Sequence, residues 1–269
     1  MSNVVEVYGY KTEMRPWLER ERLEHETLDK VFAGIKLEGL KVLDAGTGIG
    51  YAAKYLAQRI GEGVLVTIDI DASSLEMLKR LAGKELTEKL VFIKADLRNL
   101  DFIKDNYFDL ACLYYTIHTI NSTTPCGVRQ VLKEIRRVLR PSGLLIAVEN
   151  YATFEPIDDA QQLLLELARV ENEINTLISR REIDVEYDPK ELCTLLVEVG
   201  YRNPAYRKID NGSIDPTLLT WALYLKDRAR GIPDQDAREK VLAKLRTLIK
   251  KAEKTGIRSS PTYAVYAKK

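Results

Sequence analysis

Apolar and polar positions follow two different periods along the first half of the chain. Short apolar runs that end in turn residues predict strands, and they lie at residues 41–46, 64–71, 90–96, 108–115 and 144–150. Segments with a period near 3.6 predict helices, and they lie at residues 14–35, 51–63, 73–84 and 128–143. Strands that alternate with helices at this spacing favour βαβ units around a parallel sheet buried on both faces.

The pattern changes after Asn150. A long helix is predicted at residues 158–181, where acidic residues at the start and basic residues at the end complement the helix dipole. Three more helices are predicted at 188–201, 217–231 and 234–256, and two more strands at 203–209 and 260–269. The strand–helix pattern of the core therefore stops near Asn150 and resumes near Asp188, and two helical additions interrupt it.

These patterns divide the chain into four segments. We expect a helical arm or lid at residues 1–35, a cofactor-binding core at 36–150 and a helical cap insertion at 151–187. Residues 188–269 would complete the core sheet and carry a second helical insertion at about 213–256.

Composition narrows the class of protein. The chain has 269 residues, of which 45% are hydrophobic and 30% charged, as is typical of a globular protein with a sizeable core. A formal net charge of +1 gives no global bias toward nucleic acid or an anionic membrane. No apolar run reaches membrane-spanning length, the first residues lack the apolar core of a signal peptide, and three scattered cysteines suit a reducing compartment. We therefore expect a cytoplasmic protein without a membrane span.

The segment KVLDAGTGIGYAAKYLA at residues 41–57 places a glycine loop between the first strand and its helix. Gly46, Gly48 and Gly50 allow a tight turn and close approach of a ligand, and amides at a helix start suit an anion. The dinucleotide-binding fingerprint G-x-G-x-x-G needs a glycine at its sixth position, where this chain has Tyr51. Asp44 would repel a pyrophosphate but attract an ammonium group, so the loop suits a zwitterion better than a dinucleotide.

Five segments in this order resemble class I S-adenosylmethionine-dependent methyltransferases, of the ubiquinone/menaquinone-biosynthesis type that acts on small molecules. They are VLDAGTGIG, VTIDIDASSLEML, FIKADLRNLDF, YFDLACLYYTIHTI and EIRRVLRPSGLLIAVEN, and they run from about Lys41 to Asn150. The resemblance implies a Rossmann-like, seven-stranded, mostly parallel sheet with the last strand antiparallel, helices on both faces and an extra helical cap. It also implies S-adenosyl-L-methionine as cofactor and S-adenosyl-L-homocysteine as its product.

The resemblance assigns the nucleoside end of the cofactor to the second and third strands. Asp69 matches the acidic residue that accepts hydrogen bonds from both ribose hydroxyls, and Ile70 would lie against the adenine. Asp96 matches the residue that accepts from the adenine amino group, with Leu97 packed nearby. By residue type alone, Asp69 could equally be a turn or helix-start residue.

The amino-acid end of the cofactor is assigned to the glycine loop. Gly46, Gly48 and Gly50 would admit the methionine portion, and Thr47 would hydrogen-bond its carboxylate. Asp44 would attract its ammonium group.

The segment LYYTIH after the fourth strand faces the reaction centre in this fold. Tyr114 occupies the place of a cofactor contact, and its aromatic face could hold the positive sulfonium. Tyr115 and His118 are the candidate catalytic residues, with His118 as general base, although a histidine bonded to a backbone carbonyl is the competing interpretation. Tyr10 and Glu149 are candidate substrate contacts.

No metal is expected. Metal-dependent catechol-type relatives place an acid after the fourth strand and an acid–amide pair after the fifth. Glu149 and Asn150 supply the pair, but the fourth strand ends in Tyr114 and Tyr115, so the ligand set is incomplete.

The segments outside the core suggest a cover for the site. Residues of the N-terminal stretch could form a lid or an ordinary packed arm, namely Tyr8, Tyr10, Arg15 and Trp17. The later helices occupy the place of a substrate roof, and their apolar positions fit core or homodimer contacts, among them Leu163, Leu164, Leu167, Ile174 and Leu177.

We predict methyl transfer to a small organic acceptor at oxygen, nitrogen or carbon, by in-line displacement, with the protein positioning donor and acceptor. The basic segment at residues 240–254 keeps an RNA or protein methyltransferase as an alternative, although we expect no nucleic-acid partner. A nicotinamide-dependent oxidoreductase and a cofactor-binding protein without turnover are two further alternatives.

Overall fold

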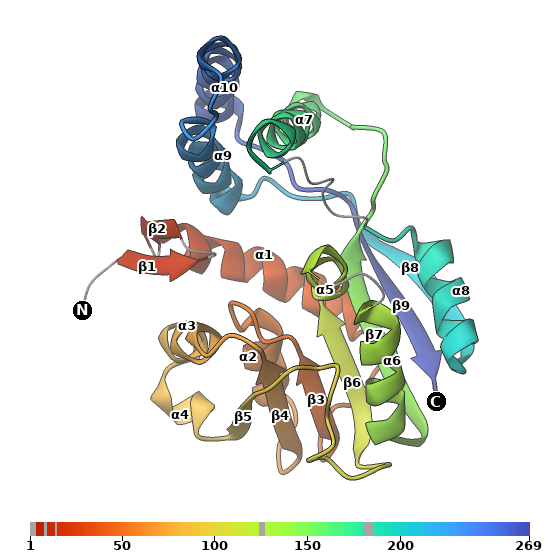
Figure 1. Cartoon of the computed structure of the whole chain (residues 1–269). Coiled ribbons are helices and arrows are strands. Elements are labelled where there is room, and N and C mark those ends of the chain that lie inside the picture. The colour runs from red at the N-terminus through yellow and green to blue at the C-terminus, as the bar shows by residue number, and fades with distance from the viewer. Residues whose placement is uncertain (1–3, 8–9, 14, 124–126, 180–185) are drawn as a thin grey trace. The chain divides into compact units, whose positions relative to one another are not determined.

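The computed structural model describes the chain except for residues 1–3, 8–9, 14, 124–126 and 180–185 (Figure 1). It divides into two compact units, which we call the sheet unit and the helical unit. The sheet unit comprises Glu24–Ala152, Asp184–Asp210 and Thr262–Lys269, and the helical unit comprises Met1–Leu23, Thr153–Ile183 and Asn211–Pro261. The division falls inside helix α1 (Arg15–Val31).

The sheet unit is built on a seven-stranded sheet with the strand order β5-β4-β3-β6-β7-β9-β8. Its strands are β3 (Lys41–Ala45), β4 (Val64–Asp69), β5 (Leu90–Lys94), β6 (Phe108–Tyr114), β7 (Leu139–Asn150), β8 (Arg202–Asp210) and β9 (Thr262–Lys268). Neighbours from β5 to β7 are parallel, and β9 runs antiparallel to both β7 and β8 (Figure 1). The predicted fold class is confirmed.

Helices cover both faces of this sheet because successive side chains of a strand point to opposite sides. Val42 and Leu43 of β3 are neighbours in sequence, yet they pack into different apolar clusters. The helices of the sheet unit are the second half of α1, α2 (Tyr51–Ala57), α3 (Ser73–Ala82), α4 (Lys84–Thr87), α5 (Ile117–Thr123), α6 (Gly127–Val138) and α8 (Pro189–Val199). The cluster around Val42 includes Leu56 of α2, and the cluster around Leu43 includes Leu132 of α6.

Several elements differ from the sequence predictions. The hairpin of β1 (Val4–Val7) and β2 (Tyr10–Glu13) and the short helices α4 and α5 were not predicted. The helix predicted at residues 128–143, with Pro141 and Gly143 ending it, was wrong at its end, because α6 stops at Val138 and β7 begins at once with Leu139. Leu139 pairs with Phe108 of β6, and this pairing across the sheet decides the boundary.

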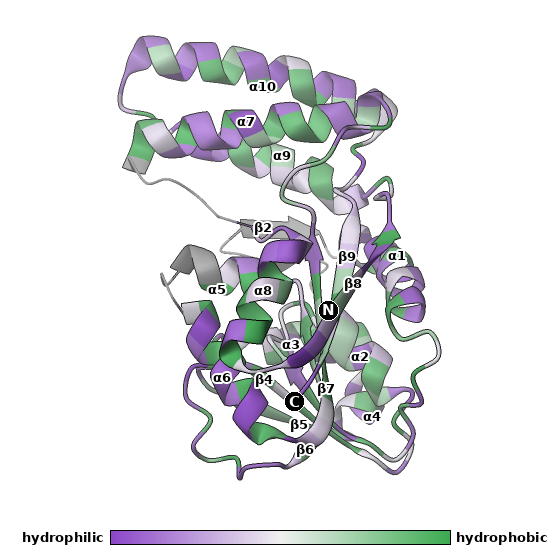
Figure 2. Ribbon diagram, turned by 90° about the vertical axis from the view of Figure 1, so that its right-hand side faces the viewer, coloured by the Kyte–Doolittle hydropathy of each residue, from purple (hydrophilic) through white to green (hydrophobic). Residues whose placement is uncertain are grey.

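The helical unit contains α7 (Asp159–Ser179), α9 (Pro216–Ala229) and α10 (Gln235–Thr255). Apolar and polar positions alternate along these helices (Figure 2). The predicted apolar positions pack in the core of this unit, with Leu163, Leu164, Leu167 and Ile174 buried and Leu177 partly buried. Asp215 and Asp234 cap the starts of α9 and α10 through their side-chain oxygens. No helix in the described part of the chain is long and apolar enough to cross a membrane.

Candidate functional site

The predicted cofactor residues lie at one edge of the sheet. Because β3, β4, β5 and β6 are parallel neighbours, their carboxyl ends share an edge, which is where ligands bind in open α/β sheets. The glycine loop follows β3, and Asp69 and Tyr114 are the last residues of β4 and β6. Asp96 comes two residues after the end of β5. The fold therefore gathers residues that lie far apart in the sequence.

The three glycines of the loop have positive φ angles of 91°, 52° and 98° at Gly46, Gly48 and Gly50. A Cβ on Gly46 would lie 2.4 Å from Thr116 Oγ1, and one on Gly50 would lie 2.7 Å from Leu78 Cδ1. A Cβ on Gly48 would meet nothing within 4 Å. Gly46 and Gly50 thus allow neighbouring segments to pack, whereas Gly48 borders open space that a ligand could approach closely.

Asp69 ties the end of β4 to the glycine loop. Its Oδ2 accepts a hydrogen bond of 2.8 Å from the Gly48 amide, and its Oδ1 accepts one of 2.9 Å from the Asp71 amide. Each carboxylate oxygen has two lone pairs, so both oxygens can accept a further hydrogen bond. The next residue, Ile70, is 64% exposed and presents an apolar surface beside this carboxylate.

Asp44 is fully buried beneath the loop. Its Oδ2 accepts a hydrogen bond of 2.7 Å from Thr67 Oγ1, which is also hydrogen-bonded to Thr47 Oγ1. Its Oδ1 has no hydrogen-bond partner among the described residues. Burial raises the pKa of Asp44 to about 7, while the Thr67 hydrogen bond opposes the rise and the Asp69 charge adds to it. A buried carboxyl oxygen without a partner is costly, and a cationic ligand would relieve that cost.

Asp96 is held by an arginine that sequence reasoning missed. Arg98 Nε lies 3.0 Å and 2.9 Å from the two carboxylate oxygens, and the Arg98 amide donates to Oδ1 at 2.9 Å. The side-chain hydrogen bond from Arg98 lowers the pKa of Asp96, so this carboxylate stays ionised. Leu97, which lies between Asp96 and Arg98 in the sequence, is buried. The sequence signal that could have indicated this pair is the basic residue Arg98 two positions after the acidic residue Asp96 in a turn.

Tyr114, the last residue of β6, and Tyr115, which follows it, have different environments. Tyr114 is buried, and its hydroxyl donates to the buried carboxylate of Glu24 on α1. Tyr115 has a positive φ of 52°, which is rare for a residue with a large side chain and often marks a functional site. Its hydroxyl lies 2.9 Å from Thr262 Oγ1, and the two tyrosine rings meet edge to face with centroids 4.5 Å apart.

His118 and Glu149 form a hydrogen-bonded pair. His118 Nδ1 lies 2.8 Å from Glu149 Oε2, and the other oxygen, Oε1, accepts a hydrogen bond of 2.6 Å from the Ile117 amide. The Glu149 side chain is 4% exposed and that of His118 is 32% exposed. The competing interpretation gave His118 a backbone carbonyl partner; in the structure a carboxylate lies at Nδ1.

The predicted residues of the N-terminal arm are less informative. Tyr10 belongs to β2, but its side chain and the whole of Tyr8 lie outside the described residues. Arg15 is exposed and pairs with Glu19 at 2.8 Å, and Trp17 is buried. No lid role follows from these contacts.

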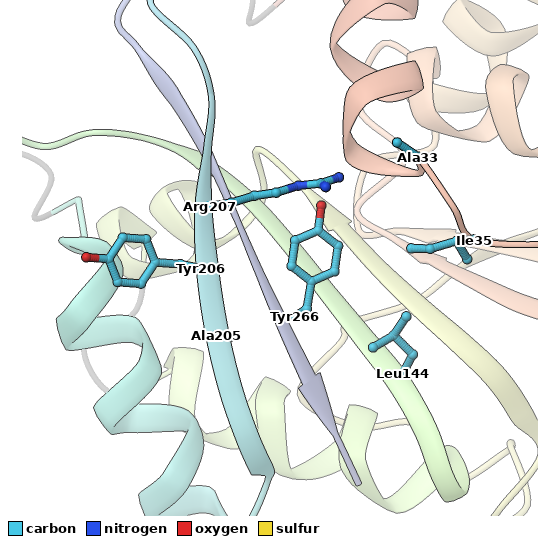
Figure 3. A pocket seen from close by; sticks show the side chains of 7 residues that line it. All are labelled: Ala33, Ile35, Leu144, Ala205, Tyr206, Arg207 and Tyr266. Carbon is cyan, nitrogen blue, oxygen red and sulfur yellow. The ribbon is translucent and has the colours of Figure 1, made fainter.

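A shallow pocket of about 390 Å³ lies elsewhere in the sheet unit, between the loop after α1 and strands β7, β9 and β8 (Figure 3). Tyr266 and Arg207, which line it, donate hydrogen bonds of 2.7 Å and 3.0 Å to the Val31 carbonyl at the end of α1. These side chains therefore satisfy a helix end. None of the predicted site residues lines this pocket.

Both the sequence and the fold resemble those of known methyltransferases. The family described as "Methyltransferase domain" matches residues 43–147. The ubiquinone/menaquinone biosynthesis C-methyltransferase UbiE of Neisseria meningitidis serogroup C is 32% identical over 189 residues, which are 66% of this chain and 73% of that protein. UbiE of Hahella chejuensis is 31% identical over 133 residues, which are 49% of this chain and 50% of its own length. A cyclopropane-fatty-acyl-phospholipid synthase-like protein from Lactobacillus casei has a TM-score of 0.69 at 17% identity, covering 95% of this chain and 93% of its own, and shares the fold.

The strand order, the antiparallel last strand and the glycine loop after β3 define a Rossmann-like methyltransferase fold. With the similarity to UbiE, the chain belongs to the class I S-adenosylmethionine-dependent methyltransferases. Their cofactor is S-adenosyl-L-methionine, which leaves as S-adenosyl-L-homocysteine. The matches to three other curated relatives cover half or less of the relative's own length, namely 50%, 28% and 44%.

The residues at the sheet edge fit this cofactor. The buried oxygen of Asp44 needs a cationic or hydrogen-bonding partner, and the cofactor carries an ammonium group. The open side of Gly48 leaves room for a ligand, and the exposed Ile70 beside Asp69 offers an apolar surface to an aromatic base.

Sequence reasoning missed several partners of the predicted residues. Thr67 lies two positions before Asp69 on β4, so strand alternation could have placed both side chains on one face. No comparable pattern in the sequence predicts that Glu24 contacts Tyr114 or that Thr116 contacts the glycine loop. Thr116 Oγ1 donates to the Ala45 carbonyl at 3.0 Å and joins the turn after β6 to the glycine loop.

Proposed function

We propose that this protein transfers the methyl group of S-adenosylmethionine to a small organic acceptor. The cofactor supplies an activated methyl group on a sulfonium leaving group, so the protein chiefly aligns donor and acceptor. The observation that carries the proposal is the buried, unpartnered oxygen of Asp44 beneath a glycine loop that is open at Gly48. The ionised carboxylate in this place favours a ligand with an ammonium group and repels a pyrophosphate.

In this proposal the amino-acid end of the cofactor lies on the glycine loop. Asp44 Oδ1 accepts a hydrogen bond from the ammonium group, and Thr67 holds the carboxyl in place through Oδ2. The Thr47 hydroxyl gives its proton to Thr67 in this structure, so a hydrogen bond from Thr47 to the cofactor carboxylate requires that hydroxyl to rotate away from Thr67. Gly48, at the open side of the loop, permits the close approach.

The nucleoside end lies on the ends of β4 and β5. Asp69 uses its remaining lone pairs for the ribose hydroxyls, and Ile70 covers one face of the adenine. Asp96, fixed by Arg98, accepts from the adenine amino group, with Leu97 beneath. The acceptor then binds near Tyr114, the last residue of β6, and Tyr115, which follows it.

Calorimetric titration with S-adenosylmethionine, S-adenosylhomocysteine and NADH tests the proposal. We expect the first two to bind and NADH not to bind. Asp69→Ala removes one charged acceptor and should weaken cofactor binding by about tenfold to a hundredfold. Asp101→Ala, which removes an exposed carboxylate of the sheet unit, serves as the control. Tighter binding of NADH than of S-adenosylmethionine would overturn the proposal.

The acceptor class needs a separate screen. Tritiated S-adenosylmethionine is incubated with quinols and phenols, amines and amino acids, and sterols and other lipids, each as its own pool. Label in a product separated from the cofactor by chromatography identifies the pool, and analysis of that product identifies the methylated atom. In the described part of the chain Cys112 is buried, Cys193 is half-buried and both are free thiols, which suits assay under reducing conditions, as for a cytoplasmic protein.

A second candidate is methyl transfer to RNA. Arg246 and Lys250 are exposed one turn apart on α10, which favours an anionic partner. Lys244 from the same basic segment is instead paired with Glu173 at 2.8 Å. Filter binding decides between RNA and a small molecule as the acceptor. Total RNA is bound to the protein and to the Arg246→Ala, Lys250→Ala double variant at about 50 and 200 mM salt. Binding that is weak at low salt and unchanged in the variant would remove this candidate.

A further inference from the structure

Glu149 is hydrogen-bonded to two neighbouring residues at the edge of the sheet where β6 and β7 end. Its two oxygens are both engaged, Oε1 by the Ile117 amide at 2.6 Å and Oε2 by His118 Nδ1 at 2.8 Å. The side chain is almost completely buried, so these bonds are its means of compensating the loss of water. Because Ile117 is the first residue of α5, Glu149 fixes both the start of that helix and the imidazole that follows it.

The pairing decides which imidazole nitrogen carries the proton. A carboxylate is only an acceptor, so Nδ1 must be the donor toward Glu149. In the neutral ring Nε2 then holds the lone pair, with Thr119 Oγ1 at 3.2 Å from it. A neighbouring carboxylate also favours the imidazolium that forms when Nε2 takes up a proton.

His118 is connected to the proposed cofactor site through the chain itself. Two residues earlier, Thr116 donates to the Ala45 carbonyl, which directly precedes Gly46. One residue before that, the Tyr115 amide donates to the Val148 carbonyl at 2.9 Å, next to Glu149. The pair therefore stands at the same sheet edge as the glycine loop, on the side where the acceptor is proposed to bind.

We infer that Glu149 is a positioning residue that holds His118 with Nε2 as the proton acceptor for methyl transfer. This inference rests on the proposed function and narrows its acceptor class to molecules with a removable proton, such as phenols and quinols. The acceptor hydroxyl gives its proton to Nε2. The electron pair left behind forms a bond to the methyl carbon, and the pair of the breaking C–S bond stays on sulfur. The imidazolium then passes the proton to water.

Nitrogen NMR of the imidazoles tests the positioning role without any acceptor. The chain has two histidines, and His25→Gln assigns the second set of signals. We expect the wild-type protein to show His118 with Nδ1 protonated. In Glu149→Gln the carboxamide can donate to Nδ1, so the ring should switch to the Nε2-protonated tautomer. Glu134→Gln is the matched control, because Glu134 also accepts a backbone amide, from Leu100 at 3.0 Å, without touching a histidine.

The inference is overturned if wild-type His118 carries its proton on Nε2, or if the tautomer is the same in wild type and Glu149→Gln. Failure of the proposed function would appear as absence of S-adenosylmethionine binding in calorimetry, with the NMR result unaffected. The two failures are therefore distinguishable.

The acceptor class is tested with two probes, 1,4-naphthoquinol, which has removable protons, and a sterol with a side-chain alkene, which can attack without first losing one. We expect transfer to the quinol, lowered about tenfold to a hundredfold in Glu149→Gln and in His118→Asn. His118→Asn keeps a donor for Glu149 and removes the proton acceptor. Affinity for S-adenosylhomocysteine should stay within about twofold in both variants. Transfer to the alkene alone, or quinol methylation at wild-type rate in both variants, overturns the inference.

Discussion

Thr67 donates a hydrogen bond of 2.7 Å to one oxygen of the buried Asp44, while the second oxygen of that carboxyl has no partner in the described part of the chain. One hydrogen bond does not compensate for complete burial, so the neutral form of Asp44 is favoured and its pKa rises to about 7. This places a titrating group beneath the glycine loop in the physiological range. Two predictions depend on it.

Stability of the protein without cofactor should fall as the pH rises through neutrality. The folded pKa of Asp44 is about 7 and its ordinary value is 3.8, so the native state binds the proton more tightly than the unfolded chain does. The stabilisation is complete below the ordinary value and is lost as the pH rises through the folded value. Urea unfolding of wild type and Asp44→Asn at about pH 5 and pH 8 should show a steeper loss for wild type, on the order of a few kcal/mol at most. Parallel pH profiles for the two proteins would contradict this.

Cofactor binding should have the opposite pH dependence. An ammonium group next to Asp44 favours the ionised carboxyl, so binding should release a proton and tighten from about pH 6 to about pH 7.5. Titration in two buffers of different ionisation enthalpy measures the released proton. Asp44→Asn should bind at least about tenfold more weakly and release fewer protons. Equal proton release by both proteins would show that another group titrates.

Alanine at two glycines of the loop should have separable effects. Gly46→Ala combines a positive φ with a Cβ 2.4 Å from Thr116 Oγ1, so we expect a loss of about 3 kcal/mol in unfolding free energy. Gly48→Ala has only the backbone cost of about 1 kcal/mol, but it should weaken cofactor binding more than it weakens the fold. Adding Thr116→Ala to Gly46→Ala should recover part of the loss, which chemical denaturation measures as a double-mutant cycle. Strict additivity would mean that the two residues do not meet.

Arg137 should stabilise the sheet unit more than a surface arginine does. Its guanidinium donates to the Ile103 and Leu100 carbonyls at 2.9 Å and 2.8 Å and pairs with Glu134 at 2.9 Å. Arg137→Met leaves these acceptors without their donor, and we expect a loss of about 2 kcal/mol. Arg140→Met, which removes an arginine whose side chain is 55% exposed, should cost less than about 1 kcal/mol. Denaturation midpoints of the two variants provide the measurement, and equal losses would refute the difference.

Most helices and strands could be predicted from the sequence because their signals are local. The apolar runs of β3, β4 and β6 and the helical period of α6 lie within a dozen residues. The start of β7 at Leu139 could not be predicted, since pairing with Phe108 decides it. The short helix α5 has no apolar run or helical period of its own. Its first amide, that of Ile117, donates a hydrogen bond to Glu149 near the end of β7.

The sequence by itself determined the fold class and the family, because five segments with distinctive residue types occur in a fixed order. It also placed Asp44, Asp69, Asp96 and His118 at strand ends. Only the tertiary structure decided the chemical state of those residues. Burial of Asp44 and the carboxylate beside His118, which is 31 residues away in sequence, arise from neighbouring strands and not from adjacent residues. Protonation depends on solvent exclusion and on partners in space, and neither is encoded in a local pattern.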